Sequence, residues 1–534
     1  MHERKKAVYE KGNWEQALTA AFRGICMLLF AVLSGCSMLL TGYNKDTSYE
    51  MIFFREDSPA GNLAGLFAAL VLVFGTVFLW RCLRQKLRIK MDTMALFVSI
   101  LMGAVSVWWV VSTNTAPRDD QALLCSYARF FNEGDFSGLG RGEYVGIYRQ
   151  QLGMITLLRV LFFFFGAGNY RSFQYLSAVL AGFLVYFGYR IVRELAGEEQ
   201  TAGMIYLLLM LCCIPMYVYV PFVYGDLISC VFLFLAAWML LSGLREFSWK
   251  KAMVCGLAAG LSVQLRQNCL IVIIAFALVL LIKLLSIRKR EALILFCSLM
   301  AGVLLTGGMV SAIYHDKIPE DSESMPVLLH IAMGTMWDRE NPGWYDFYNL
   351  ETFETAGYDA AAASEAARET IRDFVVSSVE NPAYAADFYY NKMIAQWEAP
   401  MYQCLVMNNV IVGEQGRIAA SLYRGRLSQL AEAFMNIFQL LVYGAILILL
   451  FFKRKEWCGI EKYVLLIAVF GGFLFSMIWE AKTRYVLPYM LCMIPYAAVG
   501  LAGLPAEKIT AKLPVRKNFA GASDNRLSAK SAKE

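Results

Sequence analysis

Long apolar runs separated by short polar segments follow one another along most of the chain. Each run holds roughly 15 to 20 residues, and a helix of about 20 residues crosses the roughly 30 Å hydrocarbon core of a bilayer. This pattern predicts an all-α integral membrane protein with about 12 transmembrane helices. The expected spans are residues 20–42, 62–80, 94–113, 173–190, 202–220, 227–242, 252–265, 269–285, 292–314, 433–452, 463–479 and 486–504.

Composition supports the same class of protein. The chain is 58% hydrophobic and 17% charged, with a mean hydropathy of +0.49, whereas soluble domains are about half apolar and about a quarter charged. The net charge is +6, but the basic residues lie in short connections between spans and do not form one patch. We therefore expect membrane lipid as a partner and no nucleic acid.

The basic connections also predict the orientation of the chain. In a twelve-span arrangement they all lie on one face, which the positive-inside rule assigns to the cytoplasm. We therefore expect a multi-pass protein of the plasma (cell) membrane with an uncleaved first span and both termini cytoplasmic. The basic clusters lie in segments 4–6, 81–90, 190–193, 245–251, 288–290, 453–455 and 508–517.

One apolar stretch, residues 152–166, does not fit this arrangement as a span. It is short and contains Arg159, and if it crossed the membrane every later basic cluster would move to the outer face. We expect it to lie in the outer leaflet. The two external loops are then 114–172 and 315–432, both with short amphipathic helices, and an Ala-rich helix is expected over 359–379.

Acidic residues stand at two predicted outer membrane edges. Asp119 and Asp120 follow Arg118 at the exit of a span and precede a helix with one apolar face. Asp226 opens an apolar span directly after Gly225. Aspartate often caps a helix start, but a charge that opens a span is costly unless it faces a cavity. These carboxylates are candidates for one shared site on the outer face.

Two arginines stand at the same predicted depth. Arg266 separates two apolar runs, and Arg484 precedes the last one. Paired guanidinium groups match the oxygen atoms of a phosphate. The alternative is that they pair with carboxylates such as Glu480 or with lipid headgroups.

The second external loop is rich in aromatic residues. Segments 330–349 and 388–402 contain Trp337, Trp344 and Trp397. Rigid aromatic groups suit sugar binding, although tryptophan also collects at membrane interfaces whatever the function. We take the three tryptophans as candidate contacts to an acceptor or a sugar.

Most of the 13 cysteines lie in apolar runs, where cysteine behaves as a small hydrophobic residue. Cys125 and Cys404 lie in the external loops and could form a disulfide. No Cys-x-x-Cys or His-x-x-x-His spacing points to a metal cluster.

Four segments together carry a family resemblance. They read YRQQLGMITLLRVLFFFFG, VYGDLISC, GLSVQLRQNC and WEAKTRYVLP, the last with Arg484, Tyr485 and Pro488. This chain resembles the GT-C superfamily of membrane glycosyltransferases, in particular the branch with protein O-mannosyltransferases and the lipid A aminoarabinose transferase. The MG…NPGWY and QWEAP segments look like the external loop of Gram-positive relatives, and the resemblance extends over about 94–504.

The resemblance implies transfer of a sugar from a polyprenyl-phosphate-linked donor to an extracytoplasmic acceptor, which would be a cell-envelope polymer, a lipid or a protein. Asp119 or Asp120 would be the catalytic base, assisted by Asp226. An acceptor hydroxyl needs such a carboxylate within hydrogen-bond reach to take its proton, and one base suits an inverting transfer.

By the same resemblance, Arg266 and Arg484, with Tyr485 beside the second, would bind the phosphate of the donor. A lipid phosphate that leaves with negative charge needs fixed cations or a metal ion. The cofactor is unknown from the sequence, and a divalent cation is possible.

The resemblance also suggests a division of the chain. Residues 94–314 would be the GT-C-like membrane core, preceded by a two-span addition. The expected parts are 1–93 as the addition, 94–314 with the first external loop 114–172, 315–432 as the large external loop, 433–504 as C-terminal spans and 505–534 as a basic cytoplasmic tail.

Two other classes of protein share some of these features. A transporter or flippase of a lipid-linked sugar is also polytopic, but transporters place charge near the bilayer midplane and often contain repeats. A non-catalytic membrane scaffold would use the large loop to bind a partner, and its aspartates would be dispensable.

Overall fold

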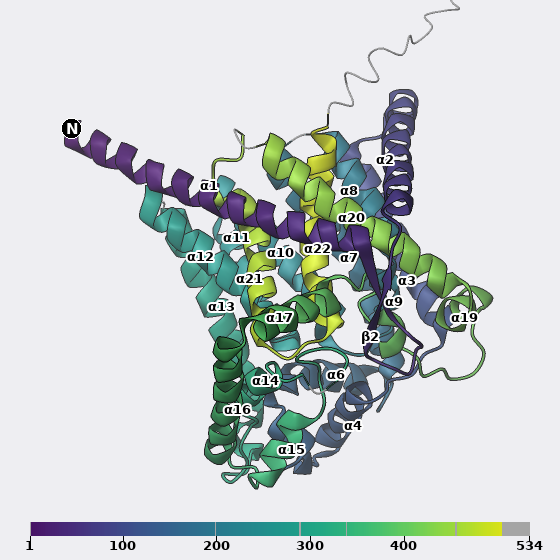
Figure 1. Cartoon of the computed structure of the whole chain (residues 1–534), viewed down its shortest axis with the longest axis vertical. Coiled ribbons are helices and arrows are strands. Elements are labelled where there is room, and N and C mark those ends of the chain that lie inside the picture. The colour runs from purple at the N-terminus through teal and green to yellow at the C-terminus, as the bar shows by residue number, and fades with distance from the viewer. Residues whose placement is uncertain (1, 198, 288–289, 338, 454–455, 505–534) are drawn as a thin grey trace, which may run out of the picture.

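The protein is a bundle of long helices with smaller helices gathered over one end (Figure 1). This computed structural model describes residues 2–197, 199–287, 290–337, 339–453 and 456–504. The expected tail, 505–534, lies outside the described residues. The long helices are α1 (His2–Leu39), α2 (Pro59–Leu87), α3 (Met91–Thr113), α7 (Tyr170–Ala196), α10 (Gly225–Arg245), α11 (Trp249–Leu265), α12 (Cys269–Ile287), α13 (Arg290–Tyr314), α20 (Leu427–Phe452), α21 (Val464–Ile478) and α22 (Leu487–Ala502).

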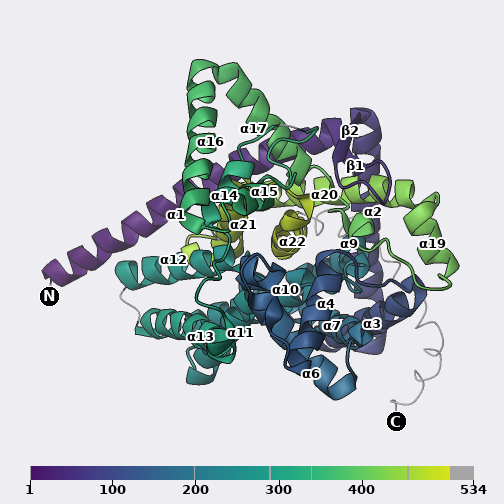
Figure 2. The ribbon, with the colours of Figure 1, turned by 90° about the horizontal axis from the view of Figure 1, so that it is seen from below.

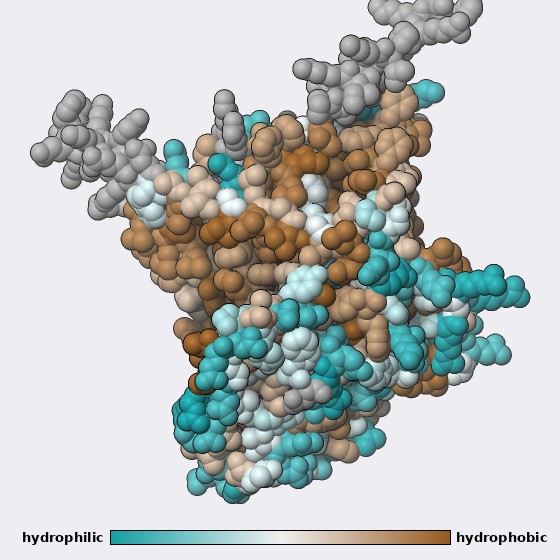
Figure 3. All heavy atoms as spheres, in the orientation of Figure 1, coloured by the Kyte–Doolittle hydropathy of each residue, from teal (hydrophilic) through white to brown (hydrophobic). Residues whose placement is uncertain are grey.

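Within the described residues, ten helical segments are long and apolar enough to cross a membrane. Their outer surfaces expose large apolar side chains such as Phe67, Leu304 and Met309, and Figure 3 shows a broad apolar band across this face of the bundle above a more polar end. Exposed apolar area on this scale is stable only against lipid. The prediction of an all-α integral membrane protein is confirmed.

Two predicted spans differ from simple membrane-crossing helices. The expected span 202–220 is divided into α8 (Gln200–Cys212) and α9 (Ile214–Val218). Pro215 lies in the first turn of α9, and it interrupts the helix because proline has no N–H to donate. The expected span 252–265 is the 17-residue α11.

One end of the bundle carries the basic connections, and we call it the basic end. Arg245, the last residue of α10, pairs with Glu194 of α7 at 3.1 Å. Arg84, Lys90 and Arg193, from two other connections, line one cavity of about 230 Å³. Connections that the charge pattern assigns to a single face are therefore neighbours in space.

The opposite end carries the candidate chemistry, and we call it the site end. The 21-residue helix α10 links the two ends, since it starts beside Asp226 and finishes at Arg245 and is roughly 30 Å long at about 1.5 Å per residue. Arg266, in the connection between α11 and α12, pairs with Asp226.

The apolar stretch after residue 151 forms α6 (Leu152–Phe165) and stays at the site end. A Cβ on Gly153 would collide with the carbonyl of Gln264, at the site end of α11. In the middle of α6, Arg159 donates to the hydroxyl of Tyr314, at the site end of α13, at 3.2 Å. Both halves of α6 thus contact the same end of the bundle, as expected for a helix that does not cross.

The smaller helices of the two loops cover the site end, as the view from below in Figure 2 shows. The Ala-rich stretch is α16, close to the expected bounds. In the described part of the chain, Cys125 and Cys404 are both free thiols. The loop helices are α4 (Asp120–Glu133), α5 (Tyr144–Ile147), α14 (Val327–Met333), α15 (Tyr348–Thr355), α16 (Ala360–Glu380), α17 (Pro382–Trp397), α18 (Cys404–Met407) and α19 (Arg417–Arg424).

The structure contains a β-hairpin between α1 and α2 that the sequence analysis did not predict. Strands β1 (Leu40–Asn44) and β2 (Ile52–Glu56) pair antiparallel, with Gly42 opposite Phe54. Gly42 also donates its N–H to the carbonyl of Glu398 at 2.7 Å, and a Cβ there would be too close to that carbonyl. The glycine therefore lets the hairpin pack against the large loop at the site end.

Candidate active site

Asp226 and Arg266 form a buried ion pair at the start of α10. The Asp226 residue is 2% exposed, and its Oδ1 lies 3.6 Å from Nε of Arg266. The preceding Gly225 allows this approach, because a Cβ there would collide with the carbonyl of Leu265. Among the described residues, Oδ2 of Asp226 has no hydrogen-bond partner, so the carboxylate keeps an open acceptor.

Arg484 lies in a single helical turn, Thr483–Val486, directly before α22. Its guanidinium group stands 5.3 Å from the ring centre of Tyr224 and 5.5 Å from that of Tyr485. Arg266 faces the same two rings at 5.0 and 5.3 Å. Two guanidinium groups over the same pair of rings repel each other, and Asp226, whose charge acts on both, offsets part of this repulsion.

The Arg484 side chain is also incompletely bonded. The residue is 7% exposed, its Nη1 reaches only a weak acceptor, the sulfur of Met407, at 3.6 Å, and its Nε has no partner in the described part of the chain. A buried donor without an acceptor is costly. The arrangement therefore suits an anionic ligand that brings several acceptor oxygen atoms.

The adjacent aspartates at the start of α4 have different surroundings. The Asp119 side chain is 68% exposed and binds Arg118 at 2.5 Å, and its backbone has φ of 46°. Asp120 is partly buried and lies close enough to Tyr144 for its charge to raise the pKa of that hydroxyl. Gln121 fixes this helix start, since its Oε1 accepts the N–H of Val223 at 2.9 Å.

Asp120 is surrounded by tyrosines. Burial, followed by the charge of Asp120, raises the pKa of Tyr224 to about 12. Burial raises the pKa of Tyr345 to about 12 as well, with Glu480 and Asp120 adding to the effect. Burial also raises the pKa of Tyr144 well above its usual range. These hydroxyl groups stay protonated and can donate hydrogen bonds, which leaves the carboxylates as proton acceptors.

Glu480 is a further member of the site. The sequence left open that it pairs with Arg484, but in the structure it has other partners. It accepts hydrogen bonds from the hydroxyl of Tyr485 at 2.6 Å and shares one with Nδ1 of His330 at 3.2 Å. Burial raises the pKa of Glu480, but His330, Tyr485 and Lys482 outweigh it and hold this pKa at about 2. Glu480 therefore positions Tyr485 beside the two arginines.

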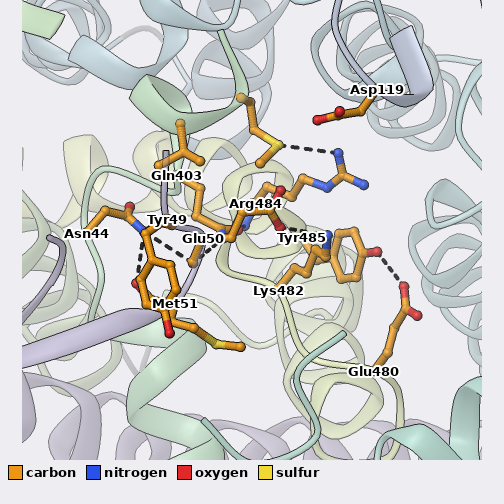
Figure 4. Close-up of polar contacts among 12 residues, drawn as sticks. Asn44, Tyr49, Glu50, Met51, Asp119, Gln403, Glu480, Lys482, Arg484 and Tyr485 are labelled. Carbon is orange, nitrogen blue, oxygen red and sulfur yellow. Dashed lines mark hydrogen bonds and ion pairs between the residues drawn. The ribbon is translucent and has the colours of Figure 1, made fainter. Parts of the chain in front are cut away.

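The site also contains Glu50 and Lys482, which sequence reasoning missed. Nζ of Lys482 pairs with Glu50 at 2.9 Å and stands 4.8 Å from the ring centre of Tyr345. Figure 4 shows Glu50, Lys482, Arg484 and Tyr485 in one group, with Glu480 beyond Tyr485. Lys482 could have been found from the sequence, because it lies two residues before the predicted Arg484 at the same membrane edge. No sequence signal pointed to Glu50, because only the folding of the hairpin brings it to Lys482.

The three candidate tryptophans have different surroundings, and Trp344 lies next to this group, because its backbone bridges to that of Ala481, between Glu480 and Lys482. Trp397 is fully buried and donates its indole N–H to Ser476 at 3.0 Å. Trp344 is buried in a small apolar core with Met51. Trp337 packs on aromatic residues of α17, including Phe388, with ring centres 6.0 Å apart. Their observed contacts are with the protein itself.

Metal ligands are a separate question. Within the described residues, no group of three or more His, Cys, Asp or Glu side chains is placed to hold a metal ion.

Comparisons with known proteins bear on the family. A family model described as dolichyl-phosphate-mannose-protein mannosyltransferase matches residues 154–306. Over these residues, the match confirms the resemblance to GT-C membrane glycosyltransferases that the sequence indicates.

Two further comparisons complete these findings. Among solved structures, the chain is similar to one titled "Crystal Structure of ArnT from Cupriavidus metallidurans bound to Undecaprenyl phosphate". The identity is 14%, the TM-score is 0.33, and the alignment covers 78% of this chain and 80% of the other. No curated protein matches the sequence.

Proposed function

We propose that the protein transfers a sugar from a polyprenyl-phosphate-linked donor to an acceptor on the extracytoplasmic side of the plasma membrane. The site end faces outward in this proposal, and both termini are cytoplasmic. The observation that carries it is the convergence of Asp120, Asp226, Arg266 and Arg484 at one end of the bundle. Two of them have buried polar atoms with no partner among the residues that the structure describes. The family-model match supports the same class of reaction.

The chemistry assigns one role to each charge. Asp120 accepts the proton of the acceptor hydroxyl while the oxygen of that hydroxyl bonds to the anomeric carbon of the sugar. The bond between that carbon and the phosphate oxygen breaks on the opposite face, so the configuration inverts. Arg266 and Arg484 stabilise the phosphate as it gains charge, while Asp226 orients Arg266 through their ion pair.

The exposed Asp119 offers a matched control for the base. Asp120→Asn keeps the shape of the side chain but removes proton acceptance, so turnover should fall roughly 100-fold or more. Asp119→Asn should cost far less, because that carboxylate pairs with Arg118 in contact with solvent. Mass spectrometry of cell-envelope polymers from cells that carry each variant in place of the wild type measures both effects.

Two outcomes would contradict the proposal. Full glycosylation by Asp120→Asn, and by the double variant at 119 and 120, would remove the single base and favour a scaffold. A lipid-linked sugar that crosses the membrane unconsumed in reconstituted vesicles would favour a flippase.

A further inference from the structure

The hairpin between α1 and α2 holds an acidic side chain against the cations of the candidate site. Glu50 lies in the turn between β1 and β2, and its Oε2 pairs with Nζ of Lys482 at 2.9 Å. Lys482 is itself buried, at 9% exposure, and is two residues from Arg484. Figure 4 shows the Glu50 side chain among these groups.

The hairpin is firmly attached in this position. Asn341 makes two hydrogen bonds to Ile52, one to each backbone group, at 2.8 and 3.0 Å. Gln403 donates to the carbonyl of Glu50 at 2.8 Å, and Asn44 donates to that carbonyl at 3.2 Å. Because the backbone is held on both sides, the position of the Glu50 side chain is set by the fold and not by chance contact of a loose loop.

Glu50 carries a charge in this environment. Burial raises its pKa, but Lys482, Arg484 and Arg118 together outweigh burial and hold the pKa below its usual range. The Glu50 side chain keeps 30% of its surface exposed, so it has room to move away from Lys482 without entering the protein core.

We propose that Glu50 competes with the donor's phosphate for Lys482 and Arg484, and so belongs to the phosphate site as its internal anion. This inference rests on the proposed function. Glu50 neutralises the cations while no phosphate is bound, and it must release Lys482 when a phosphate oxygen takes its place. The apparent affinity for the lipid phosphate is then reduced by the fraction of molecules in which Glu50 holds Lys482.

The competition lowers the apparent affinity for donor and product by the same factor, but it matters most for release of the product. The donor is a phosphodiester with one negative charge, whereas the product, a polyprenyl monophosphate, carries between one and two at neutral pH. The extra charge would bind the product tightly to the cations. Because Glu50 takes the place of the phosphate at Lys482 as the product leaves, it offsets part of this tight binding and favours release of the spent carrier.

The direction in which one substitution changes the affinity for undecaprenyl phosphate tests this role. In the full-length protein in lipid nanodiscs, Glu50→Gln should bind undecaprenyl phosphate more tightly, by about tenfold if the ion pair is formed nine-tenths of the time. Glu56→Gln, at the exposed end of the same hairpin, should bind like the wild type. A structural role for Glu50 predicts the opposite sign, since loss of its contact with Lys482 would loosen the site and weaken binding.

A second variant tests whether the effect of Glu50→Gln depends on Lys482. Lys482→Met should weaken binding, and Glu50→Gln should then give little or no gain in that background. Unchanged or weaker binding in Glu50→Gln, while the wild type binds, overturns this inference alone. Failure of both proteins to bind undecaprenyl phosphate overturns the proposed function and this inference with it.

Discussion

The adjacent residues Asp119 and Asp120 have different surroundings, because Asp119 has a non-helical backbone with φ of 46° and Asp120 begins α4. Asp119 precedes α4 and pairs with Arg118 near solvent, whereas Asp120 is the first residue of that helix and lies among tyrosines. A further buried charge, that of Lys392, is held by two backbone carbonyls. Lys392 of α17, with its Nζ donating to the carbonyls of Gly334 and Met477, ties the loop helices to the connection that carries Glu480.

Lys392 should make stability depend on pH. Burial lowers its pKa to about 7, although nearby Glu480 acts in the opposite direction. The unfolded chain, with a lysine pKa near 10.4, binds more protons between pH 7 and 10, so stability rises with pH there. From pH 7 to 9 this one group contributes up to about 2 kcal/mol.

The measurement compares thermal unfolding midpoints of the wild type and Lys392→Met in detergent at pH 7 and pH 9. Relative to the variant, the wild type should gain roughly 2–4 °C at pH 9. Lys317→Met, at an exposed lysine, should keep the wild-type slope. Parallel curves for wild type and Lys392→Met would show that Lys392 is not the titrating group.

At the scale of elements, small residues bring helices into direct backbone contact. A Cβ on Gly256 of α11 would collide with the carbonyl of Ser298 in α13, and one on Gly302 of α13 would collide with the backbone of Gly256. Membrane helices associate through such close contacts because lipid provides no hydrophobic driving force between them. This crossing fixes α11, and hence Arg266 at its end, relative to α13.

Gly302→Ala should therefore lower thermal stability by several degrees, because its methyl group would force α11 and α13 apart and cost about 1–3 kcal/mol. Gly308 lies six residues further along the same helix with no atoms near a Cβ. Gly308→Ala should leave the midpoint unchanged or raise it slightly, since alanine is the better helix former. Equal midpoints for the two variants would argue against close packing at this crossing.

At the scale of the whole molecule, the two ends of the bundle carry different chemistry. The basic end gathers Arg84, Lys90 and Arg193, and the site end gathers the carboxylates and buried cations. Helices that link the ends, such as α10, have the length that a bilayer requires. The N-terminal helices are part of the same unit, because Glu15 of α1 pairs with Lys283 of α12 at 2.5 Å.

The proposed orientation can be measured in intact cells. A cysteine at Glu369, exposed on α16 of the large loop, should react with a membrane-impermeant maleimide. A cysteine at Lys86, on the basic end, should react only after the membrane is permeabilised. The native Cys82, exposed beside it, provides an internal reference. Reaction at Lys86→Cys in intact cells would reverse the orientation and place the candidate site inside the cell.

The sequence by itself determined the class of the protein and most of its long helices. Runs of apolar residues predict spans because backbone hydrogen bonds within a lipid environment must be satisfied inside each helix. Local signals also marked Asp120, Asp226, Arg266 and Arg484, since a charge at the edge of an apolar run is costly and needs a reason. The division of 202–220 depends on Pro215, a local signal that the hydropathy pattern concealed.

Only the tertiary structure decided which side chains meet. It separated Asp119 from Asp120, because the direction of a side chain depends on the exact residue at which α4 begins. It placed Trp397 in the core and not at the site. It also brought Glu50 to Lys482 across more than 400 residues of chain. Contacts of this kind follow from the packing of whole elements, which local periodicity does not encode.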